Sequence, residues 1–203
     1  MPAPIVYKLG GSLLDHPRLP TLVRHVVAQR PNHRALIVVG GGAAADLVRG
    51  WDALHCLGDQ AAHVLALEAM RLNETLLHRL LPEARLVRNA KQSVLVAPGA
   101  IGLLCAACFV RWGEATGHPA LDHTWQVTSD SIAAWAAGIL KAAELVLLKS
   151  VAAPDGQSVE AAAAAGLVDP RFATWAANLP RVSWVNGRLE EPLIQEWLSR
   201  SPA

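Results

Sequence analysis

Two lysines in this sequence occupy positions suited to phosphate chemistry. Only four of the 18 basic residues are lysines, and two of them, Lys8 and Lys149, close apolar runs that resemble β-strands in length and composition. A solvated strand terminus would explain either lysine alone. Because both end a strand in a chain that otherwise prefers arginine, we expect compact ammonium groups directed at a transferring phosphate.

Two glycine-rich turns also follow apolar runs early in the chain. The first turn, Gly10-Gly11-Ser12, ends the run 5–9, and the second, residues 40–42, ends the run 35–39. Each turn leads into a segment with helical character. Glycine lets the main chain approach an anion closely, and backbone amides at a helix N-terminus attract phosphate. The two turns predict two phosphate-bearing ligands held near each other.

Asp130 is the acidic residue expected beside the lysines. The carboxyl ends of parallel strands lie along one edge of a sheet, where ligands bind. A helix that begins near Thr128 or Ser129 would bring Asp130 to that edge. A carboxylate between two lysines holds their ammonium groups in place and keeps them charged. Alternatively, Asp130 is only a first-turn acid that the helix macrodipole favours.

Composition limits the classes of protein to consider. With 203 residues and 52% hydrophobic content, the chain can bury one sizeable core, so we expect a single domain over residues 1–203. A net charge of +1 provides no basic field for nucleic acid. No signal peptide is visible, and the uncharged stretch 97–110 is too short to span a bilayer. We therefore expect a cytoplasmic protein without nucleic-acid or membrane partners.

Strand-like and helix-like segments alternate along the chain. This alternation predicts an α/β protein, with a mostly parallel sheet covered by helices on both faces. Strands are expected at 5–9, 35–40, 85–88, 93–97, 144–149 and 181–185. Helices are expected near 19–29, 43–54, 59–81, 130–141, 161–165, 170–178 and 190–199. The less regular segment 98–125 is interpreted as a lid or a wall of the substrate site.

The three cysteines do not form the pattern of a disulfide framework, since their number is odd. Cys105 and Cys108 form a C-x-x-C pair, and His118 and His123 follow, in an order that loosely imitates a zinc finger. The pair lies in an apolar run, however, and free cysteine usually behaves as a small buried apolar residue. We expect packing rather than a zinc site.

Four segments together resemble, in order along the chain, the motifs of the amino acid kinase superfamily. These segments are Lys8-Leu9-Gly10-Gly11-Ser12, Val39-Gly40-Gly41-Gly42, Thr128-Ser129-Asp130-Ser131 and Leu147-Leu148-Lys149-Ser150. The resemblance implies a three-layer α/β/α sandwich that transfers the γ-phosphoryl group of Mg-ATP to a carboxylate or phosphate. It implies that Lys8 and Lys149 stabilise the migrating phosphoryl group and that Asp130 organises them.

The same resemblance assigns two ligand sites, with ATP and Mg²⁺ as cofactors and no metal ligand of the protein's own. The residues implied for ATP are Lys8, Gly10, Gly11, Ser12, Lys149, Asp155, Gly156 and Asp169. The residues implied for a small phosphate-bearing acceptor are Gly41, Gly42, Arg49, Gly58, Asp59, Thr128 and Ser129. In this assignment Arg49 faces the acceptor phosphate and Asp59 the other end of the molecule.

Segments 125–135 and 166–172 are similar to a compact branch of the superfamily, the [5-(aminomethyl)furan-3-yl]methyl phosphate kinases of methanofuran biosynthesis. That branch converts the phosphate to its diphosphate, and this is the expected reaction. Uridylate kinase is the alternative within the fold, and an oxyanion- or metal-storage protein is a non-catalytic one. The spacing Gly40-x-Gly42-x-x-Ala45 also imitates a dinucleotide fingerprint, but it follows the second strand instead of the first.

Seven tryptophans are many for a chain of this length. Tryptophan is enriched in protein interfaces, although each one is more often a core residue. With the family resemblance, this content leads us to expect a homodimer or a larger homo-oligomer.

Overall fold

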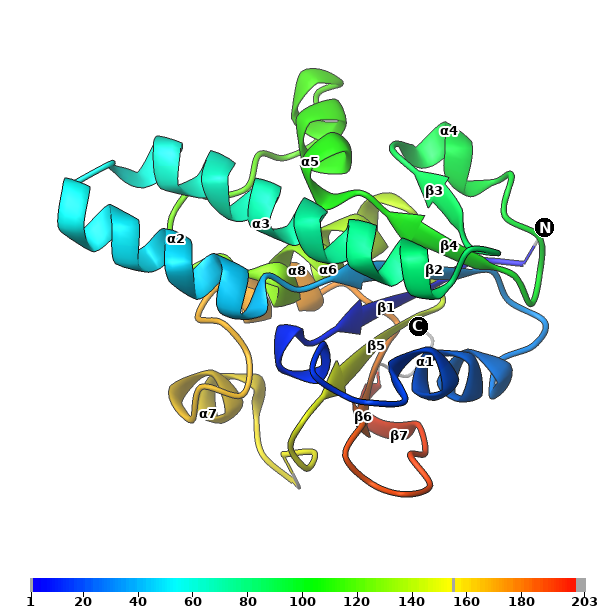
Figure 1. Ribbon diagram of the computed structural model, residues 1–203. Helices are drawn as coiled ribbons and strands as arrows, with labels where there is room; N and C mark the ends of the chain where they lie inside the picture. The colour runs from blue at the N-terminus through cyan, green and yellow to red at the C-terminus, as the bar shows by residue number, and fades with distance from the viewer. Residues whose placement is uncertain (1, 155, 200–203) are drawn as a thin grey trace.

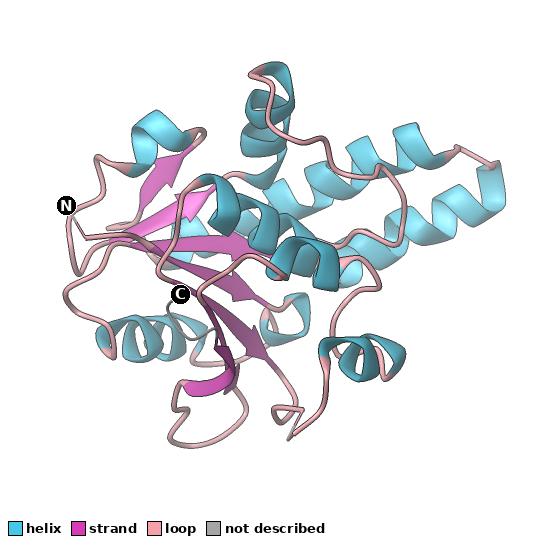
Figure 2. Cartoon of the chain, turned by 180° about the vertical axis from the view of Figure 1, so that it is seen from behind, coloured by secondary structure: helices cyan, strands magenta, loops and turns pink. Residues whose placement is uncertain are grey.

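The computed structural model describes residues 2–154 and 156–199 (Figures 1 and 2). Within these residues the strands form a seven-stranded sheet in the order β3-β4-β2-β1-β5-β6-β7. The strands are β1 (Ile5–Leu9), β2 (Ala35–Val39), β3 (Arg85–Val87), β4 (Ile101–Leu104), β5 (Glu144–Lys149), β6 (Arg181–Asn186) and β7 (Gln195–Ser199). Neighbouring strands are parallel except for β6 and β7, so the predicted mostly parallel sheet is confirmed.

Helices cover both faces of the sheet, which confirms the three-layer α/β/α arrangement (Figure 1). The helices are the 3₁₀ turn η1 (Gly11–Leu13), α1 (Leu19–Ala28), α2 (Gly42–His55), α3 (Asp59–Leu80), α4 (Ala90–Ser93), α5 (Ala106–Ala115), α6 (Ser129–Ile139), α7 (Val159–Ala164) and α8 (Phe172–Ala176). Side chains of β1 alternate between the layers: Tyr7 packs with α1, and Val6 packs with α5, α6 and α8.

The order of the strands determines where ligands can bind. The chain begins at β1 in the middle of the sheet, and β2 and β5 flank it. Leu9, at the end of β1, is in register with Val39 of β2 and Leu148 of β5. The turns that follow these three strands therefore meet at one edge of the sheet, as expected for a parallel α/β protein.

A long helical hairpin stands beside this edge. Helices α2 and α3 pack against each other and extend beyond the sheet (Figures 1 and 2). Helix α2 ends at Cys56, which adopts a left-handed conformation, and Gly58, with φ of 78°, precedes α3. The start of α2 lies against η1, so one end of the hairpin contacts the glycine turns.

The prediction of a strand at 93–97 is wrong. The prediction of an irregular segment at 98–125 is also wrong over 101–115, which contains a strand and a helix. Asn89 caps a short helix, α4, by accepting a hydrogen bond from the backbone N–H of Gln92. The strand lies later, at Ile101–Leu104, because Gly102 lets it pack tightly: a Cβ there would lie 2.9 Å from side chains of Leu36 and Val96. Helix α5 follows, and only the connection from α5 to α6 stays irregular.

The predicted helix at 190–199 is also wrong. Residues 195–199 form β7, which pairs antiparallel with the exposed edge of β6. Trp197 of β7 lies edge-on to Trp184, with ring centroids 5.6 Å apart, and stacks on Phe172. Pairing with a free strand edge and burial of an aromatic ring outweigh local helix propensity here.

The C-x-x-C pair lies in and beside the hydrophobic core. Cys105 is buried and Cys108 partly buried, and all three cysteines are free. Burial raises the pKa of the Cys105 thiol to about 12, which suits a packing role.

Across 2–154 and 156–199 no helix has both the length and the apolar character needed to cross a bilayer.

Candidate active site

Lys8, Asp130 and Lys149 form a buried ionic cluster at the carboxyl edge of the sheet. The Nζ of Lys8 lies 2.9 Å from Asp130 Oδ1, and the Nζ of Lys149 donates a hydrogen bond of 2.7 Å to Oδ2. The three side chains are 7%, 6% and 12% exposed in the order Lys8, Asp130, Lys149. The contact between these residues that the sequence predicted is present.

The positions of the three residues follow from their elements. Lys8 lies near the end of β1, and Lys149 is the last residue of the neighbouring strand β5. Asp130 is in the first turn of α6, where the Thr128 side chain caps the helix by accepting from the Asp130 backbone N–H at 3.4 Å. Three elements far apart in sequence therefore bring two ammonium groups to one carboxylate.

Burial and mutual charge shift the pKa values in this cluster. Burial alone raises the pKa of Asp130, but the ammonium groups of Lys8 and Lys149 outweigh it and hold the pKa below its ordinary value. The pKa of Lys149 falls to about 8 because the side chain is buried and because Lys8 is nearby, against the attraction of Asp130. Two ammonium groups around one carboxylate leave net positive charge, which suits an anionic ligand.

The two glycine turns touch each other directly beside the cluster. A Cβ on Gly11 would lie 2.2 Å from the backbone nitrogen of Gly42, and Gly42 has a φ of 48°. Both turns are tied to the sheet: Gly10 N donates to Leu148 O and Gly40 N to Leu9 O, each at 2.8 Å. Backbone amides of both turns are thus held close together, as the sequence predicted for two phosphate-bearing ligands.

Ser12 of the first glycine turn contacts the segment that follows β5. The hydroxyl groups of Ser12 and Ser150 are 2.9 Å apart. Gly156, with φ of 61°, is a turn residue ahead of α7. Asp155, the other residue assigned to the nucleotide loop, lies outside the described residues.

Asp169 lies under the start of α6. Its Oδ2 accepts hydrogen bonds from the backbone N–H groups of Thr128 and Ser131 and from the Thr128 hydroxyl, at 2.8 to 2.9 Å. Its Oδ1 accepts from the Ser131 hydroxyl and from Arg171 N. These contacts fix the helix that carries Asp130, whereas the contact of Asp169 with ATP stays a prediction.

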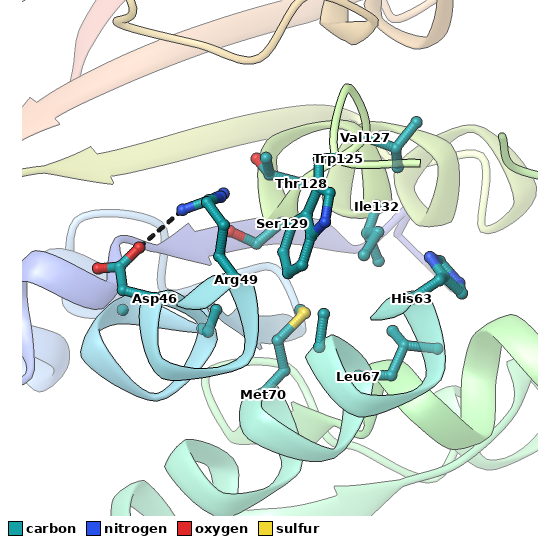
Figure 3. Close-up of a pocket in the computed structure, with 14 residues that line it drawn as sticks. Asp46, Arg49, His63, Leu67, Met70, Trp125, Val127, Thr128, Ser129 and Ile132 are labelled. Atoms are coloured by element: carbon teal, nitrogen blue, oxygen red, sulfur yellow. Dashed lines mark hydrogen bonds and ion pairs between the residues drawn. The ribbon is translucent and has the colours of Figure 1, made fainter. Parts of the chain in front are cut away.

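A pocket opens between the second glycine turn, the helical hairpin and α6 (Figure 3). Gly41 and Gly42 line it, with Thr128 and Ser129 at the start of α6. Its other lining residues come from α2, α3, α6 and the segment before α6: Ala45, Asp46, Arg49, His63, Ala66, Leu67, Met70, Trp125, Val127 and Ile132. Most of these are apolar, as is usual for small-molecule sites.

Arg49 supplies a positive charge to this pocket. Its guanidinium group lies 4.6 Å from the ring centroid of Trp125 and donates to Asp46 at 2.8 Å. Trp125 is itself held by a 2.7 Å hydrogen bond from Nε1 to Asp52. A guanidinium that lines the same pocket as Gly41 and Gly42 can bind a phosphate on the acceptor.

Gly58 and Asp59 do not line the pocket, although the resemblance assigned both to the acceptor. They lie at the turn of the helical hairpin, and both are exposed. The Gly58 N–H donates to Asp52 at 3.2 Å, and Asp52 also accepts the hydrogen bond from Trp125, which lines the pocket. Asp59 is one helical turn before His63 on α3, but it is not among the residues that line the pocket.

Sequence reasoning missed two polar residues of α3 that belong to this site. Asn73 is buried, and its Nδ2 donates to the carbonyl oxygens of Gly40 and Gly41 at 2.8 and 2.7 Å. His63 lines the pocket and is 8% exposed. A polar residue on the buried face of an amphipathic helix was the available signal for both.

Comparison with known proteins agrees with this geometry. The family model described as "Amino acid kinase family" matches residues 3–153. The uridylate kinase from Archaeoglobus fulgidus has the same fold, with a TM-score of 0.61, 16% identity, and coverage of 95% of this chain and 90% of that chain. The UMP kinase from Ureaplasma parvum also has this fold. Its TM-score is 0.64 at 14% identity, and the match covers 95% of this chain and 93% of that chain.

The aspartate kinase from Synechocystis is similar over 98% of this chain but only 41% of its own, with a TM-score of 0.60 and 15% identity. No curated protein sequence matches the chain significantly. Identities this low show a shared fold. The family match spans most of the chain and includes both glycine turns, Asp130 and Lys149, and on this basis the chain belongs to the amino acid kinase family.

Proposed function

We propose that this protein is an ATP-dependent kinase that converts a small phosphomonoester into a diphosphate, and that its acceptor is aminomethylfuranmethyl phosphate in methanofuran biosynthesis. The observation that carries the kinase proposal is the buried Lys8–Asp130–Lys149 cluster beside the two touching glycine turns. Membership of the amino acid kinase family supports the same reaction. The similarity of segments 125–135 and 166–172 to one branch supports the acceptor.

The residues divide the work of an in-line transfer. The bond between the β–γ bridging oxygen and the γ-phosphorus of ATP breaks, and an oxygen of the acceptor phosphate bonds to that phosphorus. Lys8 and Lys149 neutralise the charge that spreads over the migrating group. Asp130 holds their ammonium groups in place, and the amides of the glycine turns bind the phosphates on either side.

Magnesium enters this proposal with the nucleotide. Within the described residues, no three or more histidine, cysteine, aspartate or glutamate side chains gather as a metal site. Mg²⁺ at kinase sites keeps several waters and binds through substrate phosphates with few protein carboxylates. We therefore propose that Mg²⁺ binds mainly through the phosphates of ATP. Bound there, Mg²⁺ would shield the charge of the phosphates.

Arg49 is the proposed contact for the phosphate already present on the acceptor. It lines the pocket with Gly41 and Gly42, close to the glycine turn that faces the cluster. Arg49→Ala should raise the KM of the acceptor about tenfold or more and leave the KM of ATP nearly unchanged. Equal effects on both KM values would contradict this assignment.

The decisive experiment is a phosphorylation assay with ATP and purified protein. Aminomethylfuranmethyl phosphate and UMP are compared at matched concentrations, with product detected as the diphosphate. Efficient conversion of the furan compound supports the proposal. Conversion of UMP alone would replace the proposed acceptor by uridylate, which the fold of two neighbours favours as the second candidate. If neither the furan compound nor UMP is phosphorylated, a binding or storage role is favoured.

The proposal also includes a homodimer or larger homo-oligomer located in the cytoplasm, where ATP is available. Of the seven tryptophans, Trp51 on α2 is the exposed one, with 44% of its surface accessible. Leu47 and Leu54 of the same helix are also exposed. Light scattering on the purified protein tests the oligomeric state directly, and a monomeric mass would contradict it.

A further inference from the structure

Trp125 is an aromatic residue of the acceptor pocket to which the proposed transfer step gives no task. It lies in the connection from α5 to α6, is partly exposed, and lines the same pocket as Arg49. The guanidinium group of Arg49 lies over its ring, with Cζ 4.6 Å from the ring centroid. Figure 3 shows the Arg49 side chain between Asp46 and this ring. Because an aromatic face attracts a cation, Trp125 restricts where the charge of Arg49 lies.

The indole of Trp125 is itself held on the helix that carries Arg49. Its Nε1 donates a 2.7 Å hydrogen bond to Oδ2 of Asp52, which is three residues after Arg49 on α2. Hydrogen bonds to a charged carboxylate are among the stronger ones in proteins. The connection before α6 is thus tied to α2 through both Asp52 and Arg49, and the ring is oriented before a ligand arrives.

The ion pair between Arg49 and Asp46 is weak by comparison. The two side chains are 50% and 70% exposed, and ion pairs between exposed side chains contribute little to stability. A guanidinium group has five N–H donors, and within the described residues the hydrogen bond from Arg49 to Asp46 uses Nη1. A phosphate can therefore replace the Asp46 carboxylate while the Trp125 ring keeps its contact with the guanidinium group.

We propose that Trp125 is a positioning residue for the acceptor. It holds the guanidinium group of Arg49 in the pocket, so that the N–H groups are available to the acceptor phosphate when that phosphate displaces Asp46. This inference rests on the part of the proposed function that assigns the acceptor phosphate to Arg49. It gives the segment before α6, which the sequence predicts as a wall of the substrate site, a defined task in acceptor binding.

A double-mutant cycle tests whether Trp125 acts through Arg49. Binding of aminomethylfuranmethyl phosphate and of UMP is measured by calorimetry without ATP for the wild type, Trp125→Ala, Arg49→Ala and the double variant. Trp125→Ala should weaken each ligand that the wild type binds by about 3- to 30-fold, the range for a contact between a cation and an aromatic face. In the Arg49→Ala background the same substitution should change binding less than about twofold.

Two further variants separate the aromatic face from packing. Trp125→Phe keeps an aromatic face and should bind the acceptor within about threefold of the wild type. Trp125→Leu keeps apolar volume without such a face and should lose affinity as Trp125→Ala does. In assays with ATP, Trp125→Ala should raise the KM of the acceptor and leave kcat within about twofold, because binding is weakened equally before and during transfer.

Asp46→Ala should have the opposite effect. It removes the carboxylate that the phosphate must displace, so the acceptor should bind up to about fivefold more tightly. The matched control is Trp112→Ala, which removes another partly exposed indole, from α5 and outside the pocket. Trp112 packs against Phe109 and His118, so this variant reports a general effect of losing a packed tryptophan. It should leave acceptor binding within about twofold.

The outcomes separate this inference from the proposed function. Equal losses from Trp125→Ala with and without Arg49 would overturn the positioning role, because the effect would not pass through the guanidinium group. A Trp125→Phe variant that binds no better than Trp125→Leu, weaker binding in Asp46→Ala, or no binding of either phosphomonoester by the wild type would overturn it as well. If binding follows the expected pattern but no phosphate is transferred from ATP, the kinase proposal fails and the role of Trp125 stands.

Discussion

At the scale of single residues, the site depends on two ammonium groups that share one buried carboxylate. Lys8 and Lys149 each lie within 2.9 Å of Asp130, and removing either partner would leave a buried charge less compensated. The arrangement keeps two cations close together, which the repulsion between them would otherwise oppose. In the proposed function, this preorganised positive charge stabilises a transferring phosphoryl group.

Alanine substitutions test the role of the two lysines. Lys8→Ala or Lys149→Ala should lower kcat by about 10²-fold or more, because the charge on the migrating phosphoryl group loses its stabilisation. Arginine at either position should also be poor, since a planar guanidinium does not occupy the place of an ammonium. Lys91→Ala, at an exposed position on α4, is the control. Wild-type turnover in either site variant would contradict the mechanism.

The pKa of Lys149 predicts a pH dependence. This pKa is lowered to about 8, so the side chain is charged below that pH and loses its proton as the pH rises through it. We expect kcat/KM for ATP, which reports the free enzyme, to fall as the pH rises above about 8. A profile that stays flat from about pH 7 to pH 9 would show that the neutral amine suffices or that the pKa is higher.

At the scale of elements, the start of α6 and the two glycine turns position the chemistry. Asp169 accepts hydrogen bonds from residues on either side of Asp130, and so holds the helix start from outside the helix. Asn73 of α3 holds the second glycine turn through two carbonyl oxygens. Under the proposed function, neither residue needs to touch a substrate to affect the rate, since both orient groups that are proposed to bind one.

Asp169→Asn tests whether this residue positions α6 or binds ATP. The amide cannot accept from Thr128 and Ser131 at both oxygens, so Asp130 should shift and kcat should fall on the order of tenfold. A positioning role leaves the KM of ATP within about twofold, whereas a direct nucleotide contact raises it. Asp122→Asn, which alters the partly exposed partner of Arg171, is the control.

Gly11→Ala tests the contact between the glycine turns. The new Cβ would lie 2.2 Å from Gly42 N, so one turn must move. We expect a loss of about 1–3 kcal/mol in the free energy of unfolding, together with a large loss of activity. The control is Gly50→Ala in α2, where nothing lies within 4 Å of the new Cβ. That substitution should stabilise by about 0.5–1 kcal/mol.

At the scale of the whole molecule, the proposed sites lie where the strand order reverses. The chain runs from β1 towards β2 and β4 on one side and later adds β5 and β6 on the other. The first glycine turn is linked to β5, and the second lies beside the helical hairpin and its pocket. Ligands at this edge would contact both halves of the sheet.

Nucleotide binding should therefore stabilise the whole fold. At ATP concentrations near 100 times Kd, the free energy of unfolding rises by about 2.7 kcal/mol. For a chain of this size that corresponds to about 5–10 °C in Tm, measured by a thermal scan. Adenosine, which lacks the phosphates, should give a much smaller shift, and Lys149→Ala should reduce the shift with ATP. Equal shifts with adenosine and ATP would contradict phosphate binding at the turns.

Most of the candidate site at the sheet edge could be predicted from the sequence, because its residues follow short apolar strands. Lys8, Lys149 and both glycine turns are fixed in place once those strands are parallel neighbours, since parallel strands end along one edge. Asp130 follows from the Thr128 cap, a local signal. The sequence thus determined the sheet class and which residues meet at its edge.

Only the tertiary structure decided the elements and contacts that depend on distant partners. Residues 195–199 became a strand because β6 offered a free edge, and 101–104 became one because Gly102 permits close packing on Leu36. His63 and Asn73 reach the site through the path of α3 beside it, whereas Asp59, at the first turn of the same helix, does not line the pocket. Local helix and strand propensities do not predict these contacts, because the contacts depend on how the helices pack on the folded sheet.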